Sequence, residues 1–201
     1  MAAFTLAVGL DATKRQMTQE DSPLTPEEIS MAQTIYGNTI DYSKVRIVTD
    51  KPSAFLPWGS MTIGNTIYCP RGRGGLKPEF IHEMMHIWQN QKDGGLWSAV
   101  KLFLESPQGY ISKEVYKYEA DSTKKMEDYN IEQQGNMARD LFLLKENIAR
   151  NPGAPPPALY TSLKKIFEEG VCPNPGPLTT KPPSTERTWE IFKTPKAEAI
   201  L

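Results

Sequence analysis

The sequence predicts an α+β protein that is mostly helical, with a small sheet ahead of a helix that carries histidines. The stretch KVRIVTD has the composition of one strand. The stretch AFLPWGSMTIGNTIYCP predicts two more strands, which meet in a tight hairpin at Gly64 and Asn65. From residue 78 to residue 150, apolar residues then recur mostly at helical spacing. A small sheet followed by several helices is typical of the α+β class.

The helices are predicted from their capping residues and apolar spacing. Thr25 can cap a first helix, Pro26 suits its first position, and Glu28 completes a capping box. Gly37 is expected to end this helix. Later helices are expected from Pro78 onward and over residues 96–106, 109–122 and 128–150, the last being the longest.

Proline usage divides the chain. Ten of the seventeen prolines follow residue 151, and such a density of proline excludes helix interiors and central strands. We therefore expect a loosely held arm over residues 1–22, a core domain over residues 23–150 and a proline-rich tail over residues 151–201. Within the tail, one short helix is expected, with an apolar side made of Leu159, Leu163, Ile166 and Phe167.

The composition, 39% hydrophobic and 23% charged, is that of an ordinary soluble globular protein. A net charge of -1 gives no indication of a nucleic-acid partner. The amino-terminal MAAFTLAVGL has no basic segment before its apolar run, so we expect no signal peptide, no membrane span and synthesis in the cytoplasm. Cys69 and Cys172 lie in no CxxC pattern and are expected to be unpaired thiols.

Both histidines of the chain lie in the stretch PEFIHEMMHIWQNQ, in an HExxH motif. His82 and His86 are four residues apart, so on a helix their rings project from one face and can bind one zinc ion. Glu83 lies one position round the helix, where its carboxylate can take a proton from a water bound to that zinc. The motif therefore predicts two zinc ligands and a general base. The alternative is a pair of helix histidines that bind no metal.

A third protein ligand should be a carboxylate, because a catalytic zinc takes three protein ligands and no histidine is left. Glu119 and Glu132 are candidates, since each borders an apolar stripe of a predicted helix. Gly135 lies one turn beyond Glu132, and glycine inside a helix costs about 1 kcal/mol relative to alanine. This cost indicates that another helix packs closely there. The residues alone leave the choice of ligand open.

Other residues are candidates for supporting roles. Gln89 could hydrogen-bond a histidine ligand, and Asp128 and Asp140 could accept the second N–H of a histidine. The thiolate of Cys172 could fill the open zinc position, although an ordinary tail cysteine is the simpler interpretation. Stabilising the reaction intermediate requires an electrophile besides zinc. The candidates for this role are Tyr116, Tyr118, Tyr129 and Arg139.

The stretches FIHEMMHIWQNQ, DYNIEQQ and GNTIYCP resemble the metallopeptidase-like domains of Vgr-related and Rhs-associated bacterial proteins. Such domains also occur as carboxy-terminal extensions of VgrG spike proteins in type VI secretion systems. The resemblance implies a zincin-like fold and a site of the gluzincin kind, in which His82, His86 and Glu132 bind Zn²⁺ and Glu83 is the general base. It also implies that the hairpin lines a cleft for an extended peptide.

The leading prediction is therefore a zinc metallopeptidase that hydrolyses peptide bonds through a zinc-bound water, with Glu83 as base. The resemblance implies a bacterial secretion effector, exported to the periplasm of a target cell, with a spike or an immunity protein as partner. Two alternatives stay open. One is a non-catalytic accessory protein of a secretion apparatus that retains the fold, and the other is a metal-dependent hydrolase of cell-wall amide bonds.

Overall fold

The computed structural model describes residues 21–49, 60–69, 77–93, 107–153 and 155–173. Residues 1–20 of the predicted arm, the predicted helix over 96–106 and the end of the tail lie outside the described residues. The helices are α2 (Pro26–Tyr36), α3 (Lys77–Asp93), α5 (Pro107–Ser112), α6 (Ile131–Arg150) and α7 (Ala158–Gly170), with the 3-10 helices η1 (Tyr42–Lys44), η3 (Glu114–Tyr116) and η4 (Met126–Asp128). The strands are β1 (Asp21–Pro23), β2 (Arg46–Thr49), β3 (Met61–Ile63) and β4 (Thr66–Cys69). The predicted class, α+β and mostly helical, is confirmed. None of the described helices is long and apolar enough to cross a membrane.

The strands form one mixed sheet in the order β1-β2-β4-β3. The predicted hairpin is confirmed: β3 and β4 are antiparallel, and Gly64 has a φ of +59°, which glycine adopts at low cost. The parallel pairing of β2 with β4, which aligns Ile47 with Ile67, was not predicted. Strand β1, antiparallel to β2, was also not predicted and begins within the expected arm. Strand β3 therefore lies at one edge of the sheet.

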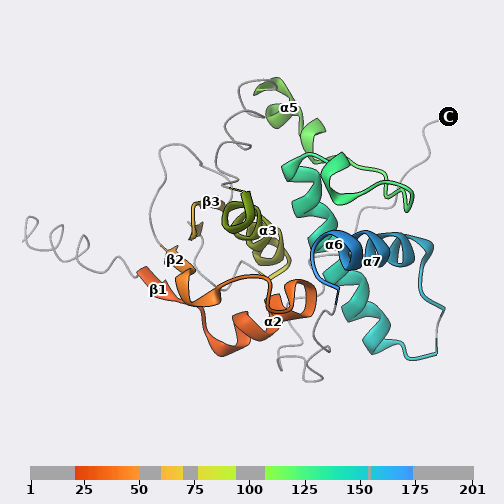
Figure 1. The fold of residues 1–201 in the computed structure, drawn as a ribbon, viewed down its shortest axis with the longest axis horizontal. Helices are drawn as coiled ribbons and strands as arrows, with labels where there is room; N and C mark the ends of the chain where they lie inside the picture. Colours follow the sequence, from red (N-terminus) through yellow and green to blue (C-terminus); the bar gives the residue numbers. More distant parts are fainter. Residues whose placement is uncertain (1–20, 50–59, 70–76, 94–106, 154, 174–201) are drawn as a thin grey trace, which may run out of the picture.

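Helix α3 lies at the centre of the molecule, with the sheet on one side and α6 and α7 on the other (Figure 1). Because both sides are covered, α3 is buried around most of its circumference. Its buried polar residues, His82, Glu83 and Gln89, are thereby held inside the protein. The buried apolar residues of α3 are Phe80, Ile81, Met84, Met85, Ile87 and Trp88.

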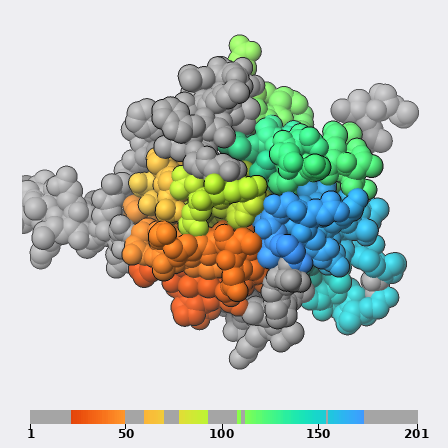
Figure 2. Space-filling model, viewed as in Figure 1, coloured from red at the N-terminus to blue at the C-terminus, as the bar shows by residue number. Residues whose placement is uncertain are grey.

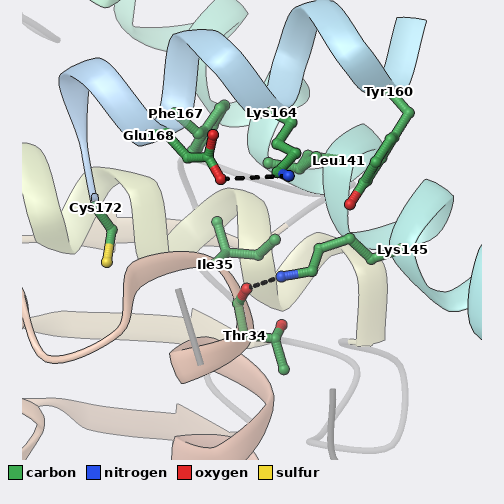
Figure 3. A pocket seen from close by; sticks show the side chains of 9 residues that line it. All are labelled: Thr34, Ile35, Leu141, Lys145, Tyr160, Lys164, Phe167, Glu168 and Cys172. Atoms are coloured by element: carbon green, nitrogen blue, oxygen red, sulfur yellow. Dashed lines mark hydrogen bonds and ion pairs between the residues drawn. The ribbon is translucent and has the colours of Figure 1, made fainter. Parts of the chain in front are cut away.

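Helix α7, expected in the tail, packs against the core. Its apolar side is buried through Leu163, Ile166 and Phe167, whereas Leu159 is exposed. Residues of α2, α6 and α7 line a pocket (Figure 3). On the molecular surface, the segment that contains α2 (orange) meets α7 (blue), as Figure 2 shows. There the Lys145 ammonium of α6 donates to the Thr34 carbonyl, 2.5 Å away. This carbonyl is in the last turn of α2, where helix carbonyls lack intrahelical partners, so the contact joins the two helices.

The prediction of a helix over residues 109–122 is wrong after Ser112. Helix α5 ends at Ser112, and Lys113 has a φ of 63°, which breaks a right-handed helix. The next carbonyls accept hydrogen bonds from side-chain amides of the α6 amino-terminal region, so they do not form a continued helix. The bonds run from Asn130 to Val115, from Asn136 to Tyr116 and from Gln133 to Lys117.

Candidate metal centre

The structure brings both histidines of α3 to Glu132 at the start of α6. Nε2 of His82 lies 3.2 Å from Nε2 of His86 and 3.2 Å from Oε2 of Glu132. Nε2 of His86 lies 3.5 Å from the same oxygen. The three side chains are between 10% and 16% exposed. Three electron-donating atoms thus form a nearly equilateral triangle in the protein interior.

Local structure explains how each corner of the triangle is placed. The four-residue spacing puts the two imidazoles on one face of α3, with ring centroids 4.9 Å apart, as predicted. Glu132 is in the first turn of α6, where the Asn130 side chain caps the helix by accepting hydrogen bonds from the backbone N–H groups of Glu132 and Gln133. A carboxylate is favoured at this position because the helix amino terminus carries partial positive charge.

Gly135 permits the close approach of α6 to α3. A Cβ atom at this position would lie 2.6 Å from Cε1 of His82 and 2.7 Å from its Nδ1, well inside van der Waals contact. The expectation that another helix packs against Gly135 is therefore confirmed, and that helix is α3. Glycine is needed here for space.

The second nitrogen of each imidazole contacts a side-chain amide. Nδ1 of His82 lies 3.0 Å from Oδ1 of Asn136, and Nδ1 of His86 lies 2.9 Å from Oε1 of Gln89. The Gln89 contact was predicted. Asn136 was missed, although it lies four residues after Glu132 and so on the same face of α6. In both contacts the atom that faces the ring is an amide oxygen, which can only accept a hydrogen bond.

The convergence of two imidazole nitrogens on a carboxylate favours a cation, and without a metal that cation is a proton. Burial lowers the pKa of His86, but the hydrogen bond and charge of Glu132, together with the charge of Glu83, outweigh it and raise the pKa to about 9. Burial raises the pKa of Glu132, but its hydrogen bonds to both histidines hold that pKa well below the usual range. A metal ion must therefore displace a proton at neutral pH.

Glu83 lies beside the triangle and is held by the edge strand. The Thr62 hydroxyl on β3 donates to Oε2 of Glu83 over 2.7 Å. Glu83 is buried, and its negative charge acts on both His86 and Tyr116. Sequence reasoning missed Thr62. The only available signal was strand alternation, which turns Thr62 to the opposite face from Met61 and Ile63.

Tyr116 is the candidate electrophile that lies beside the cluster, with its ring centroid 6.2 Å from that of His82. Burial, and then the charges of Glu132 and Glu83, raise the pKa of Tyr116 well above its usual range. The side chains of the other three candidates contact residues outside the cluster. Tyr118 donates to Asp140, Arg139 pairs with the same carboxylate, and the Tyr129 hydroxyl donates to the Glu119 carbonyl.

The remaining candidates lie apart from the triangle. Glu119 is exposed in the irregular segment that replaces the expected helix. Asp128 accepts a hydrogen bond from the backbone of Lys125, so it does not orient a histidine as proposed. Cys172 is buried in the pocket between α2, α6 and α7 (Figure 3) and is not in the cluster, and neither cysteine is part of a disulfide in the described chain.

The spacing of the triangle fits a tetrahedral metal ion. A tetrahedral zinc with ligand bonds of about 2.0–2.1 Å separates its ligand atoms by about 3.3–3.4 Å. The observed separations of 3.2, 3.2 and 3.5 Å agree with this geometry. The fold and the site therefore define a small α+β protein with a buried candidate metal centre of two histidines and one carboxylate.

No protein-family model matches the chain. The chain is 32% identical over 136 residues to the type VI secretion system spike protein VgrG2b of Pseudomonas aeruginosa. The matched region covers 61% of this chain and 13% of that protein. It is also similar to the solved structure of the effector domain of P. aeruginosa VgrG2b, with 30% identity and a TM-score of 0.53, covering 85% of this chain and 97% of that domain. The chain belongs to the family of this effector domain. It spans 13% of the length of the whole spike protein.

Proposed function

We propose that the chain is a zinc-dependent peptidase of the gluzincin kind with a zincin-like fold. His82, His86 and Glu132 are the proposed ligands, and Glu83 is the proposed general base. The observation that carries this proposal is the buried triangle of donor atoms, 3.2 to 3.5 Å apart, with a carboxylate beside it. Two imidazole nitrogens and one carboxylate oxygen are donors typical of a catalytic zinc, and they leave a fourth position open.

When bound, zinc supplies a Lewis acid that polarises a carbonyl and lowers the pKa of water. Glu83 accepts the proton of the attacking water and passes it to the leaving amine. The Thr62 hydroxyl keeps the carboxylate oriented in both states, because a hydroxyl can donate to a carboxylate and accept from a carboxylic acid. Tyr116, whose raised pKa keeps its hydroxyl protonated, is placed to donate to the developing oxyanion.

The proposed setting is type VI secretion. Similarity to the effector domain of a spike protein supports a role as a secreted effector, delivered to the periplasm of a target cell. The proposed partners are a spike protein and an immunity protein. The proposed substrate is an extended peptide, because β3 is an edge strand beside Glu83 and can pair with a peptide backbone.

Zinc binding and hydrolysis are expected to depend on Glu132. The wild type should bind a single zinc ion and release peptides from an unfolded protein substrate, with loss of activity on chelation. Glu132→Ala should lose both properties because it removes one corner of the triangle. Glu119→Ala is the matched control and should keep both, since Glu119 is exposed. Zinc content by elemental analysis and peptide release by mass spectrometry measure these outcomes.

Each other result has a distinct meaning. A wild type that binds no zinc contradicts the proposal. Zinc binding without hydrolysis of any tested substrate indicates the accessory role. Release of wall fragments in place of peptides indicates an amide hydrolase of the cell wall.

Zinc affinity is expected to rise with pH because the metal displaces a proton. With the His86 pKa raised to about 9, the metal-free cluster is protonated at neutral pH. The affinity should therefore rise about tenfold per pH unit between about pH 6 and 8, and level off above about pH 9. Calorimetry in buffers of different ionisation enthalpy should report about one proton released per zinc at pH 7. A pH-independent affinity would show that the cluster holds no such proton.

A further inference from the structure

We infer that the carboxamides of Gln89, Gln134 and Asn136 are positioning residues that fix both imidazoles in one tautomer, with Nδ1 protonated and Nε2 turned to the metal. This inference rests on the proposed function and deepens it. Backbone carbonyls determine how each amide is oriented, because a carbonyl oxygen can only accept a hydrogen bond.

Two backbone carbonyls fix the orientation of the Gln134 amide. Its Nε2 lies 3.0 Å from the carbonyl oxygen of Met126 and 2.8 Å from that of Tyr129. Gln134 is 8% exposed, and reversing its amide would place an oxygen against two carbonyls in the interior. The NH₂ group must therefore face these carbonyls, and Oε1 must face the other way.

The orientation of the Gln134 amide determines that of the Gln89 amide, which contacts His86. Oε1 of Gln134 accepts a hydrogen bond from Nε2 of Gln89 over 2.9 Å, and the same nitrogen donates to the Ile131 carbonyl over 3.2 Å. Both hydrogens of the Gln89 amide are thus used, and its oxygen is turned to Nδ1 of His86, 2.9 Å away. An acceptor at this place requires a hydrogen on Nδ1, which leaves Nε2 with its lone pair.

A separate contact, from Asn136, places an acceptor oxygen at Nδ1 of His82. Nδ2 of Asn136 donates to the Tyr116 carbonyl over 2.9 Å, so its Oδ1 is the atom that faces Nδ1 of His82 at 3.0 Å. The hydrogen bonds donated by Gln134 and Asn136 end on carbonyls of the segment between α5 and α6. The partners are neutral amides, and a carboxylate in their place would increase the basicity of the ligand. The amides therefore orient the rings without adding negative charge to the centre.

The inference is tested by replacing Gln89 or Gln134 with methionine, which is unbranched and similar in length to glutamine. Gln89→Met is expected to weaken zinc binding by about 10- to 100-fold, and Gln134→Met, one step further from the metal, by about tenfold. The control is Gln91→Met, also on α3. The Gln91 amide contacts Asp41 and Asn65, so this variant should keep wild-type affinity. Competition with a chromophoric chelator measures the affinities.

A second measurement reports the tautomer directly, by proton NMR of the protein loaded with Co²⁺ alone. The wild type should show two strongly shifted, slowly exchanging N–H resonances, one from each Nδ1. Gln134→Met should lose the His86 resonance or make it exchange rapidly, while the His82 resonance stays. Wild-type zinc affinity together with two slow resonances in Gln134→Met would overturn the inference.

If circular dichroism shows that Gln134→Met does not fold, Gln89→Met decides by the same two criteria. The outcome also separates this inference from the proposed function. A wild type with both resonances but no peptide hydrolysis contradicts only the proposed peptidase. An active wild type whose amide variants are unchanged contradicts only the inference, and a wild type that binds neither Zn²⁺ nor Co²⁺ contradicts both.

Discussion

Glu83→Gln is expected to lower kcat for peptide hydrolysis by about 10²- to 10⁴-fold, the range that a general base contributes. Glutamine has the shape of glutamate, and its side-chain oxygen can still accept the hydrogen bond from Thr62. It cannot take a proton from the attacking water. Zinc affinity should change little, since Glu83 is not one of the three triangle residues. Initial rates and a zinc titration on the same preparations measure both effects.

Glu79→Gln is the matched control for this variant, because Glu79 is exposed in the first turn of the same helix. It should keep wild-type rates. Full activity in Glu83→Gln would show that another group acts as the base. Loss of zinc binding in Glu83→Gln would show instead that this carboxylate supports the metal centre.

Gly135→Ala is expected to weaken zinc binding by about 100-fold or more. This exceeds the loss of about 10- to 100-fold expected when a metal-binding side chain loses a hydrogen-bond partner. The new methyl group would lie 2.6 Å from the His82 ring, so the ring or the whole of α6 must move. The variant should also lose about 1–3 kcal/mol of stability through overpacking. Helix propensity alone predicts the opposite sign, since alanine is favoured over glycine by about 1 kcal/mol inside a helix.

The sign of the stability change therefore decides the interpretation of Gly135. Thermal unfolding of the metal-free protein measures it without reference to activity. Asn147→Ala, at an exposed position of α6, is the control and should leave zinc affinity unchanged. A Gly135→Ala variant that is more stable than the wild type and binds zinc normally would show that α3 and α6 have room to separate.

Local patterns predicted the elements that depend on neighbouring residues. The capping box of Thr25 and Glu28 is present at the start of α2, and Gly64 forms the turn of the β3–β4 hairpin. In contrast, Lys113 interrupts a stretch with helical apolar spacing. The amides that hydrogen-bond to the following carbonyls come from the α6 region, 15 to 20 residues further along the chain, and no local pattern reports them. The helix expected around Glu119 was wrong for this reason.

The sequence by itself determined the half of the site that lies on one helix. His82, Glu83 and His86 are placed by the helical repeat alone, because residues three or four apart share a face. The residues alone left the third corner open between Glu119 and Glu132, and only the tertiary structure placed Glu132 there and revealed the contacts of Asn136 and Thr62. Glu132 meets the histidines because Gly135 lets α6 approach α3, and Thr62 reaches Glu83 because β3 packs on that helix. These contacts join residues 21 to 50 positions apart, so they depend on how the elements pack rather than on any local repeat.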